Sequence, residues 1–159
     1  MGMQHPEEHF RQGKVALANG RAVRAAAHFH DAIDEEERQA PVRRQMRYLS
    51  YYGLSLSLAY KPKREYVELC ERAAKEDGFD AELQANLAKV YLLARKKTKA
   101  LDALVRGIRL DPTNKRLLKM LASVDRRRSP VVPGLSRDHF LNRAAGRWRH
   151  RLFPPRASA

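Results

Sequence analysis

Two histidines and a glutamate near the start of the chain have a spacing that could hold a metal ion. His5, Glu8 and His9 match the H-x-x-E-H pattern, in which two imidazoles one helical turn apart bind zinc and the glutamate acts as a base. Such a site also needs a third ligand further along the chain, and Pro6 lies inside the motif. We therefore expect this segment to form the first turn of a helix, and we predict no metal site and no cofactor.

The other residues with reactive side chains are also expected to be structural. Cys70 is the only cysteine, so the chain has neither an internal disulfide nor a cysteine-based zinc site. His28 and His30 are two residues apart and face different sides of a helix. The sequence contains no glycine-rich phosphate loop and no nucleophile motif, so we predict that the protein is not an enzyme.

Helical periodicity dominates residues 1–125. Residues that end helices, such as Asn19-Gly20, Lys61-Pro62, Gly78 and Asp111-Pro112, separate the periodic segments. No hairpin signal lies between alternating apolar runs, so the predicted fold class is all-α. The pattern predicts helices at residues 6–18, 21–37, 42–60, 63–76, 81–94, 97–110 and 114–124.

Small residues recur at intervals typical of stacked helical hairpins. Gly13 lies 40 residues before Gly53, which lies 35 residues before Ala88. A small side chain lets a neighbouring helix approach closely, and a period near 34 residues is the signature of helical-hairpin arrays. A second series has intervals of 41 and 34 residues and consists of Ala32, Ala73 and Gly107.

The repeated positions resemble the tetratricopeptide repeat. The clearest match is the third unit, with Leu87, Ala88, Tyr91, Ala100, Leu104, Gly107 and Pro112. The first unit has Gly13, Gly20, Ala25, Phe29 and Ala32, and the second, with one extra residue between its helices, has Tyr52, Gly53, Leu56, Cys70 and Ala73. The resemblance implies a right-handed α-solenoid of three repeats, at about 6–39, 46–79 and 80–113, with a capping helix at 114–125.

The resemblance also implies a concave groove lined by the first helix of each unit. Such a groove suits an extended peptide or an amphipathic helix of a partner protein, held mainly by burial of apolar side chains. The expected function is that of an adaptor or scaffold, with cations at the groove fixing polar or acidic ends of the ligand. The candidate groove residues are Phe10, Lys14, Leu17, Arg47, Ser50, Leu54, Leu58, Lys89, Leu92 and Leu93.

The positive charge is concentrated towards the carboxyl end of the chain. The sequence has 32 Lys and Arg residues against 18 Asp and Glu, a net charge of +14. Residues 126–159 hold 9 basic residues and 1 acidic residue, so this short tail carries +8 and residues 1–125 carry +6. A strongly basic segment attracts nucleic acid, anionic membranes or acidic proteins.

The tail is predicted to contain a linker and one amphipathic helix. Pro130, Pro133 and Gly134 favour an extended linker at 126–135, and apolar residues four apart predict a helix at about 136–152. Three roles are open for this helix: docking on the repeats or on a second copy, anchoring another protein, or contacting RNA or an anionic membrane. The candidate residues for an anionic partner are Arg126, Arg127, Arg128, Arg143, Arg147, Trp148, Arg149 and Arg151.

Cysteine usage and hydropathy favour a cytoplasmic protein. A single cysteine suits a reducing compartment. The first eleven residues lack the apolar core of a secretory signal. The longest mostly apolar stretch, residues 48–60, is well short of the roughly 20 residues that span a bilayer.

Overall fold

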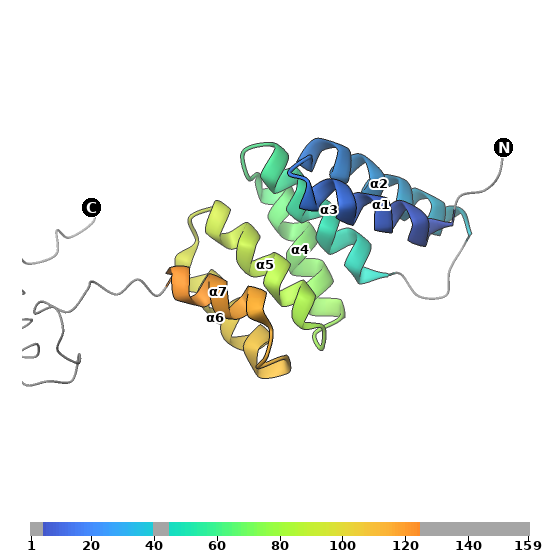
Figure 1. Cartoon of the computed structure of the whole chain (residues 1–159). Helices are drawn as coiled ribbons and strands as arrows, with labels where there is room; N and C mark the ends of the chain where they lie inside the picture. Colours follow the sequence, from blue (N-terminus) through green and yellow to red (C-terminus); the bar gives the residue numbers. More distant parts are fainter. Residues whose placement is uncertain (1–4, 40–44, 125–159) are drawn as a thin grey trace, which may run out of the picture. The chain divides into compact units, whose positions relative to one another are not determined.

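The computed structural model describes residues 5–39 and 45–124 (Figure 1). In these ranges the chain is all-helical and contains no strand, so the all-α prediction is confirmed. None of these helices combines the length and the apolar character needed to cross a bilayer. The predicted linker at 126–135 and tail helix at 136–152 lie outside the described residues. The helices are α1 (Pro6–Ala18), α2 (Ala22–Arg38), α3 (Met46–Ala59), α4 (Arg64–Glu76), α5 (Ala81–Leu93), α6 (Lys97–Leu110) and α7 (Lys115–Val124).

Local capping explains where several helices begin. Pro6 lies in the first turn of α1, and the Nδ1 atom of His5 accepts a hydrogen bond from the amide two residues further on (3.4 Å). The Asp80 carboxylate accepts from the corresponding amide at the start of α5 (2.6 Å). The Asn114 side chain accepts from two backbone amides at the start of α7, each at 3.2 Å.

The helix ends also follow the predicted breakers. Gly20 follows α1 with a φ of +71°, a left-handed conformation that glycine adopts without steric cost. The main difference from the sequence prediction is the start of α3, which begins at Met46 and not at residue 42. Gln45 is the N-cap residue there and is extended, with φ −80° and ψ 96°.

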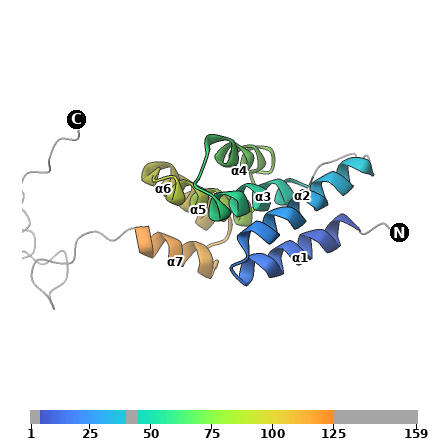
Figure 2. The ribbon, with the colours of Figure 1, turned by 90° about the horizontal axis from the view of Figure 1, so that it is seen from above.

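Consecutive helices pack against each other along the whole series from α1 to α7. In addition, α3 contacts α5 and α5 contacts α7, so alternate helices form a second set of contacts. In Figure 2, α4 lies on one side of the helical array, and α1 and α7 lie on the opposite side. Side chains of α1, α3, α5 and α7 can therefore meet on one face.

Two apolar cores hold the helices together. An aromatic core lies among α1, α2 and α3, and its rings belong to Phe10, Phe29, Tyr48 and Tyr51, with centroids 5.0 to 5.5 Å apart. A larger, mainly aliphatic core extends from α3 to α7. Its largest fully buried side chains are Leu54, Leu83, Leu104 and Leu117.

Three glycines stand where helices come closest. A Cβ added to Gly13 would lie 2.6 Å from the Phe29 ring, and one added to Gly107 would lie 2.9 Å from the Leu117 side chain. At Gly53 the nearest atom is a backbone carbonyl oxygen of α4, at 2.7 Å. The recurring small residues thus allow close helix approach, as their spacing predicted.

Candidate functional site

Three of the predicted groove residues are buried. Phe10 is 4% exposed, Leu54 1% and Ser50 0%. Phe10 belongs to the aromatic core and Leu54 to the aliphatic core, while the Ser50 hydroxyl accepts a hydrogen bond from Asn86. The expectation that these three side chains line an open groove is therefore wrong, because neighbouring helices cover them.

The other seven predicted groove residues keep some solvent access. Lys14 and Leu58 are exposed. Leu17 and Leu92 pack partly against the aliphatic core, so they offer less apolar surface than expected. The half-buried members of the set are Leu17, Arg47, Lys89, Leu92 and Leu93.

A series of polar side chains connects α1, α3, α5 and α7. Each of them bonds to, or forms an ion pair with, a member on another helix, and we call the set the inner polar row. Only three of its members were candidate groove residues. The row consists of Glu7, Lys14, Arg47, Tyr48, Ser50, Tyr51, Glu82, Asn86 and Arg116.

At one end of the row, Glu7 on α1 binds two side chains of α3. Its Oε2 atom accepts hydrogen bonds from Nη2 of Arg47 (2.6 Å) and from the Tyr48 hydroxyl (2.9 Å). The Arg47 and Glu7 side chains are 40% and 48% exposed. Since exposed ion pairs contribute only about 0–1 kcal/mol, Arg47 can exchange Glu7 for another carboxylate at small cost.

In the middle of the row, Glu82 on α5 connects α1 and α3. Its Oε1 atom accepts a hydrogen bond from the Tyr51 hydroxyl and lies 3.7 Å from Nζ of Lys14. The Lys14 and Glu82 side chains are 47% and 44% exposed. The lysine therefore combines a fixed position with open access to solvent.

At the other end of the row, Asn86 joins α3, α5 and α7. Its Nδ2 atom donates to the Ser50 hydroxyl (3.2 Å), and its Oδ1 atom accepts from Nη2 of Arg116 (2.8 Å). Asn86 is 0% exposed, so these two bonds satisfy an amide that would otherwise be costly to bury. Arg116 brings a third cation to the row.

Two of the cations, Lys14 and Arg47, lie over aromatic rings. Nζ of Lys14 lies 5.7 Å from the Phe10 ring centroid and 5.6 Å from that of Tyr51. The guanidinium carbon of Arg47 lies 5.1 Å from the Phe10 centroid and 5.4 Å from that of Tyr48. Rings within about 6 Å attract a cation through their quadrupole, so they position both charged groups without neutralising them.

Burial changes the acidity of the two tyrosines in the row. Burial and the hydrogen bond to Glu7 raise the pKa of Tyr48 to about 12. Burial and the hydrogen bond to Glu82 raise the pKa of Tyr51, although nearby Arg116 opposes this shift. Both hydroxyls therefore remain hydrogen-bond donors throughout the physiological pH range.

These tyrosines predict an alkaline loss of stability. Unfolded tyrosine ionises near pH 10, whereas Tyr48 and Tyr51 keep their protons beyond that value when folded. Above pH 10 the unfolded state therefore binds fewer protons than the native state, and the free energy of unfolding decreases as pH rises. Urea titrations at several pH values should show that the free energy of unfolding decreases above pH 10, and the raised pKa values of Tyr91 and Cys70 add to the same decrease.

The matched variant replaces both ionisable groups. Tyr48→Phe combined with Tyr51→Phe should make the decrease between pH 10 and 12 less steep. Tyrosinate absorbance should rise together with the loss of helical circular dichroism in the unmodified chain. An unchanged slope in the double variant would contradict the assignment of the effect to these two side chains.

The sequence signal for the row was present but weak. Glu82 and Asn86 are four residues apart and therefore lie on one face of α5. Periodicity does not show which residue of another helix each side chain meets. The partners Tyr48 and Arg116 consequently escaped sequence reasoning, whereas the family spacing had placed Glu7 among the groove-lining positions.

The other residues considered in the sequence analysis are Cys70, which is buried, and the tail residues. The Cys70 thiol is buried and donates a hydrogen bond to the carbonyl oxygen of Ser50 (3.3 Å). Burial raises its pKa to about 12, so the thiol stays protonated and fills space beside α3. All candidate tail residues, from Arg126 to Arg151, lie outside the described residues.

One group of side chains in the described ranges has the composition of a metal-binding site. His9, His28 and Asp31 bring possible ligand atoms within 4.8 Å of one another. The group lies between α1 and α2, and none of its members belongs to the inner polar row.

No protein-family model matches this sequence, and no curated protein matches it either. The resemblance to the tetratricopeptide repeat therefore rests on the residues of the three units.

Proposed function

We propose that this protein is a non-enzymatic adaptor that binds an acidic segment of a partner protein along the inner polar row. In this proposal the helices form a right-handed solenoid of three tetratricopeptide-like hairpins, at 6–39, 46–79 and 80–113, with a cap at 114–125. Two features support the arrangement: consecutive helices pack throughout, and α3 contacts α5 as α5 contacts α7.

The observation that carries the proposal is the pair of supported cations. Lys14 and Arg47 are held over the Phe10 ring, yet close to half of each side chain is open to solvent. Their partners Glu7 and Glu82 are also about half-exposed. Carboxylates of a bound segment can therefore replace these intramolecular partners, because the cations are already positioned and little ordering is required.

The balance of charge and apolar surface favours an acidic ligand. The row contains three cations, Lys14, Arg47 and Arg116, against two carboxylates, and Lys89 adds a further positive charge on α5. The apolar contribution is smaller than the sequence predicted, since Phe10 and Leu54 are buried. Exposed Leu58 and half-buried Leu93 supply the apolar contacts in the proposed complex.

Reversing the charge of the two supported cations is expected to abolish capture of the partner. The Lys14→Glu, Arg47→Glu double variant should lower the affinity of a purified partner at least tenfold, equivalent to about 1.4 kcal/mol. Affinity purification with mass spectrometry identifies the proteins held by the unmodified chain, and calorimetry with the purified partner measures the loss. Circular dichroism checks that the variant is folded.

A matched control makes the same change of charge on another helix. Arg72 and Lys75 are exposed on α4, outside the row, so Arg72→Glu, Lys75→Glu should leave the partner bound. Equal losses in both double variants would mean that net charge alone governs binding. Retention in both would mean that the row is not the binding face.

A second candidate function uses the tail. Its +8 charge favours RNA or an anionic membrane, and such binding weakens steeply with salt and disappears when residues 126–159 are removed. Binding to the inner polar row should survive that deletion. Comparing the full chain with residues 1–125 in a salt titration therefore separates the two functions.

A further inference from the structure

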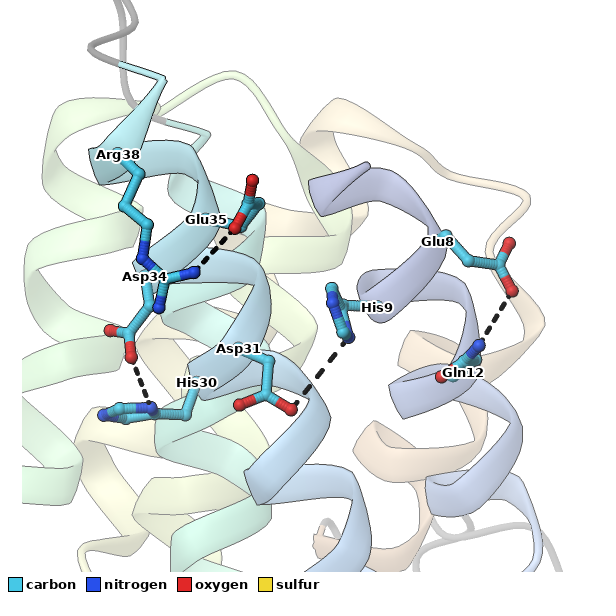
Figure 3. A network of polar contacts seen from close by, with 8 residues as sticks. All are labelled: Glu8, His9, Gln12, His30, Asp31, Asp34, Glu35 and Arg38. Atoms are coloured by element: carbon cyan, nitrogen blue, oxygen red, sulfur yellow. Dashed lines mark hydrogen bonds and ion pairs between the residues drawn. The ribbon is translucent and has the colours of Figure 1, made fainter. Parts of the chain in front are cut away.

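Three side chains from two helices converge away from the inner polar row. Figure 3 shows His9 on α1 directed towards Asp31 on α2, and their Nδ1 and Oδ2 atoms are 4.0 Å apart. His28 precedes Asp31 by three residues, so the two share a face of α2. Possible ligand atoms of all three residues lie within 4.8 Å of one another.

Both histidines have an unsatisfied buried nitrogen. The Nδ1 atoms of His9 and His28 are shielded from solvent and have no hydrogen-bond partner. A buried polar atom without a partner is costly, and native proteins rarely leave one unpaired. An ion coordinated through both Nδ1 atoms would give each of them a partner.

The donor set is suited to a transition metal. Two imidazole nitrogens and one carboxylate oxygen are ligands that Zn²⁺ prefers, and three protein ligands leave a coordination position for water. Ligand atoms of a tetrahedral zinc ion lie about 3.3 Å apart. Asp31 is 53% exposed, so its carboxylate can turn inwards to close the remaining gap.

We propose that His9, His28 and Asp31 bind a divalent transition-metal ion, with Zn²⁺ as the preferred ion. The ion would tie α1 to α2 and satisfy both buried imidazole nitrogens. This site is independent of the proposed adaptor function, because no residue of the inner polar row takes part in it.

A hollow on the surface borders one member of the group. His28 lines a surface hollow of about 370 Å³ between α1 and α2, together with Glu8, Gln12, Arg11, Arg21 and Arg24, whereas His9 and Asp31 do not line it. Arg11 is paired with Glu8 (2.8 Å), so its charge is partly compensated beside the site.

The other histidines of α1 and α2 are already engaged. His5 caps α1 through its Nδ1 atom, which accepts a hydrogen bond from the Glu7 amide. His30 pairs with Asp34 (3.2 Å), as Figure 3 shows. The H-x-x-E-H segment thus contributes one ligand, His9, and the others come from α2.

Zinc titration of the full chain tests the site. Calorimetry in a buffer that does not bind metal should show that the unmodified chain binds Zn²⁺, and the variants assign the binding to this site. His28→Asn and Asp31→Asn should each lower its affinity by about 100-fold or more, since loss of an outer-shell partner alone costs about 10–100-fold. Zn²⁺ should also raise the thermal unfolding midpoint of the unmodified chain, and this shift should be lost in both variants.

Two histidine variants serve as matched controls. His5→Asn and His30→Asn should retain the unmodified affinity, and Co²⁺ bound to either should keep the same visible absorption spectrum. Equal loss in His5→Asn would place the ion on the H-x-x-E-H segment and overturn the proposal. Unchanged affinity in Asp31→Asn and His28→Asn would also overturn it. Since Asp31 is largely exposed, its variant is expected to fold even if His28→Asn does not.

Discussion

The Phe29→Ala variant is expected to lose about 4 kcal/mol of the free energy of unfolding. Phe29 is 0% exposed and belongs to the aromatic core. Its ring centroid is 5.5 Å from that of Phe10 and 5.3 Å from that of Tyr51. Truncation removes buried apolar area and leaves a cavity beside Gly13. Because glycine has no side chain, this residue cannot fill the cavity. Urea denaturation followed by circular dichroism measures the loss.

A control on the same helix separates packing from helix propensity. Val23 is 57% exposed, so Val23→Ala should change the stability by no more than about 0.5 kcal/mol. The ring of Phe29 is also what a Cβ at Gly13 would meet, at 2.6 Å. Gly13→Ala should therefore be destabilising in the unmodified chain, and much less destabilising when it is combined with Phe29→Ala in one variant. Additive effects of these two substitutions would contradict the packing described for α1 and α2.

The Gly53→Ala variant is expected to lose about 3 kcal/mol, the upper part of the usual range for overpacking. An added Cβ would lie 2.7 Å from the carbonyl oxygen of Tyr66 and 2.9 Å from Sγ of Cys70. A backbone oxygen inside a helix cannot rotate away, so α4 as a whole would have to shift. The better helix propensity of alanine returns only about 1 kcal/mol. Thermal and urea unfolding both report the net loss.

Two further variants test whether the backbone contact is responsible. Gly78→Ala adds a Cβ whose nearest neighbour would be the carbonyl oxygen of Ala74 at 3.9 Å, an ordinary contact. It should therefore change the stability by no more than about 0.5 kcal/mol. Cys70→Ala removes the sulfur but leaves the Tyr66 carbonyl, so adding it to Gly53→Ala should rescue little stability. Full rescue would assign the clash to the thiol.

Helix positions were largely predictable from the sequence because their signals are local. The breakers Gly20, Gly78 and Pro112 act on the residues beside them, and the caps at Asp80 and Asn114 act within one turn. The start of α3 was missed by four residues, since the segment before it carries no comparable capping signal and Gln45 caps with no side-chain bond. The repeat spacing likewise predicted that Gly13, Gly53 and Gly107 lie where helices approach closely, because residues that recur at a regular interval occupy the same helix face in each unit.

The candidate site was predictable only in part. Family spacing placed Lys14 and Arg47 among the groove residues, and both side chains are partly exposed. The same spacing placed Phe10, Ser50 and Leu54 on it as well, although neighbouring helices cover all three. Spacing defines a direction from the helix axis, whereas burial depends on the distance to the next helix.

Sequence alone therefore determined the all-helical class, most helix boundaries and the uneven distribution of charge. These properties depend on neighbouring residues or on composition, and both can be read along a single chain. Tertiary structure alone decided that Glu82 meets Lys14 and Tyr51, and that His9 faces His28 and Asp31. Such contacts join side chains of different helices, and their distances follow from how side chains of different sizes pack between those helices.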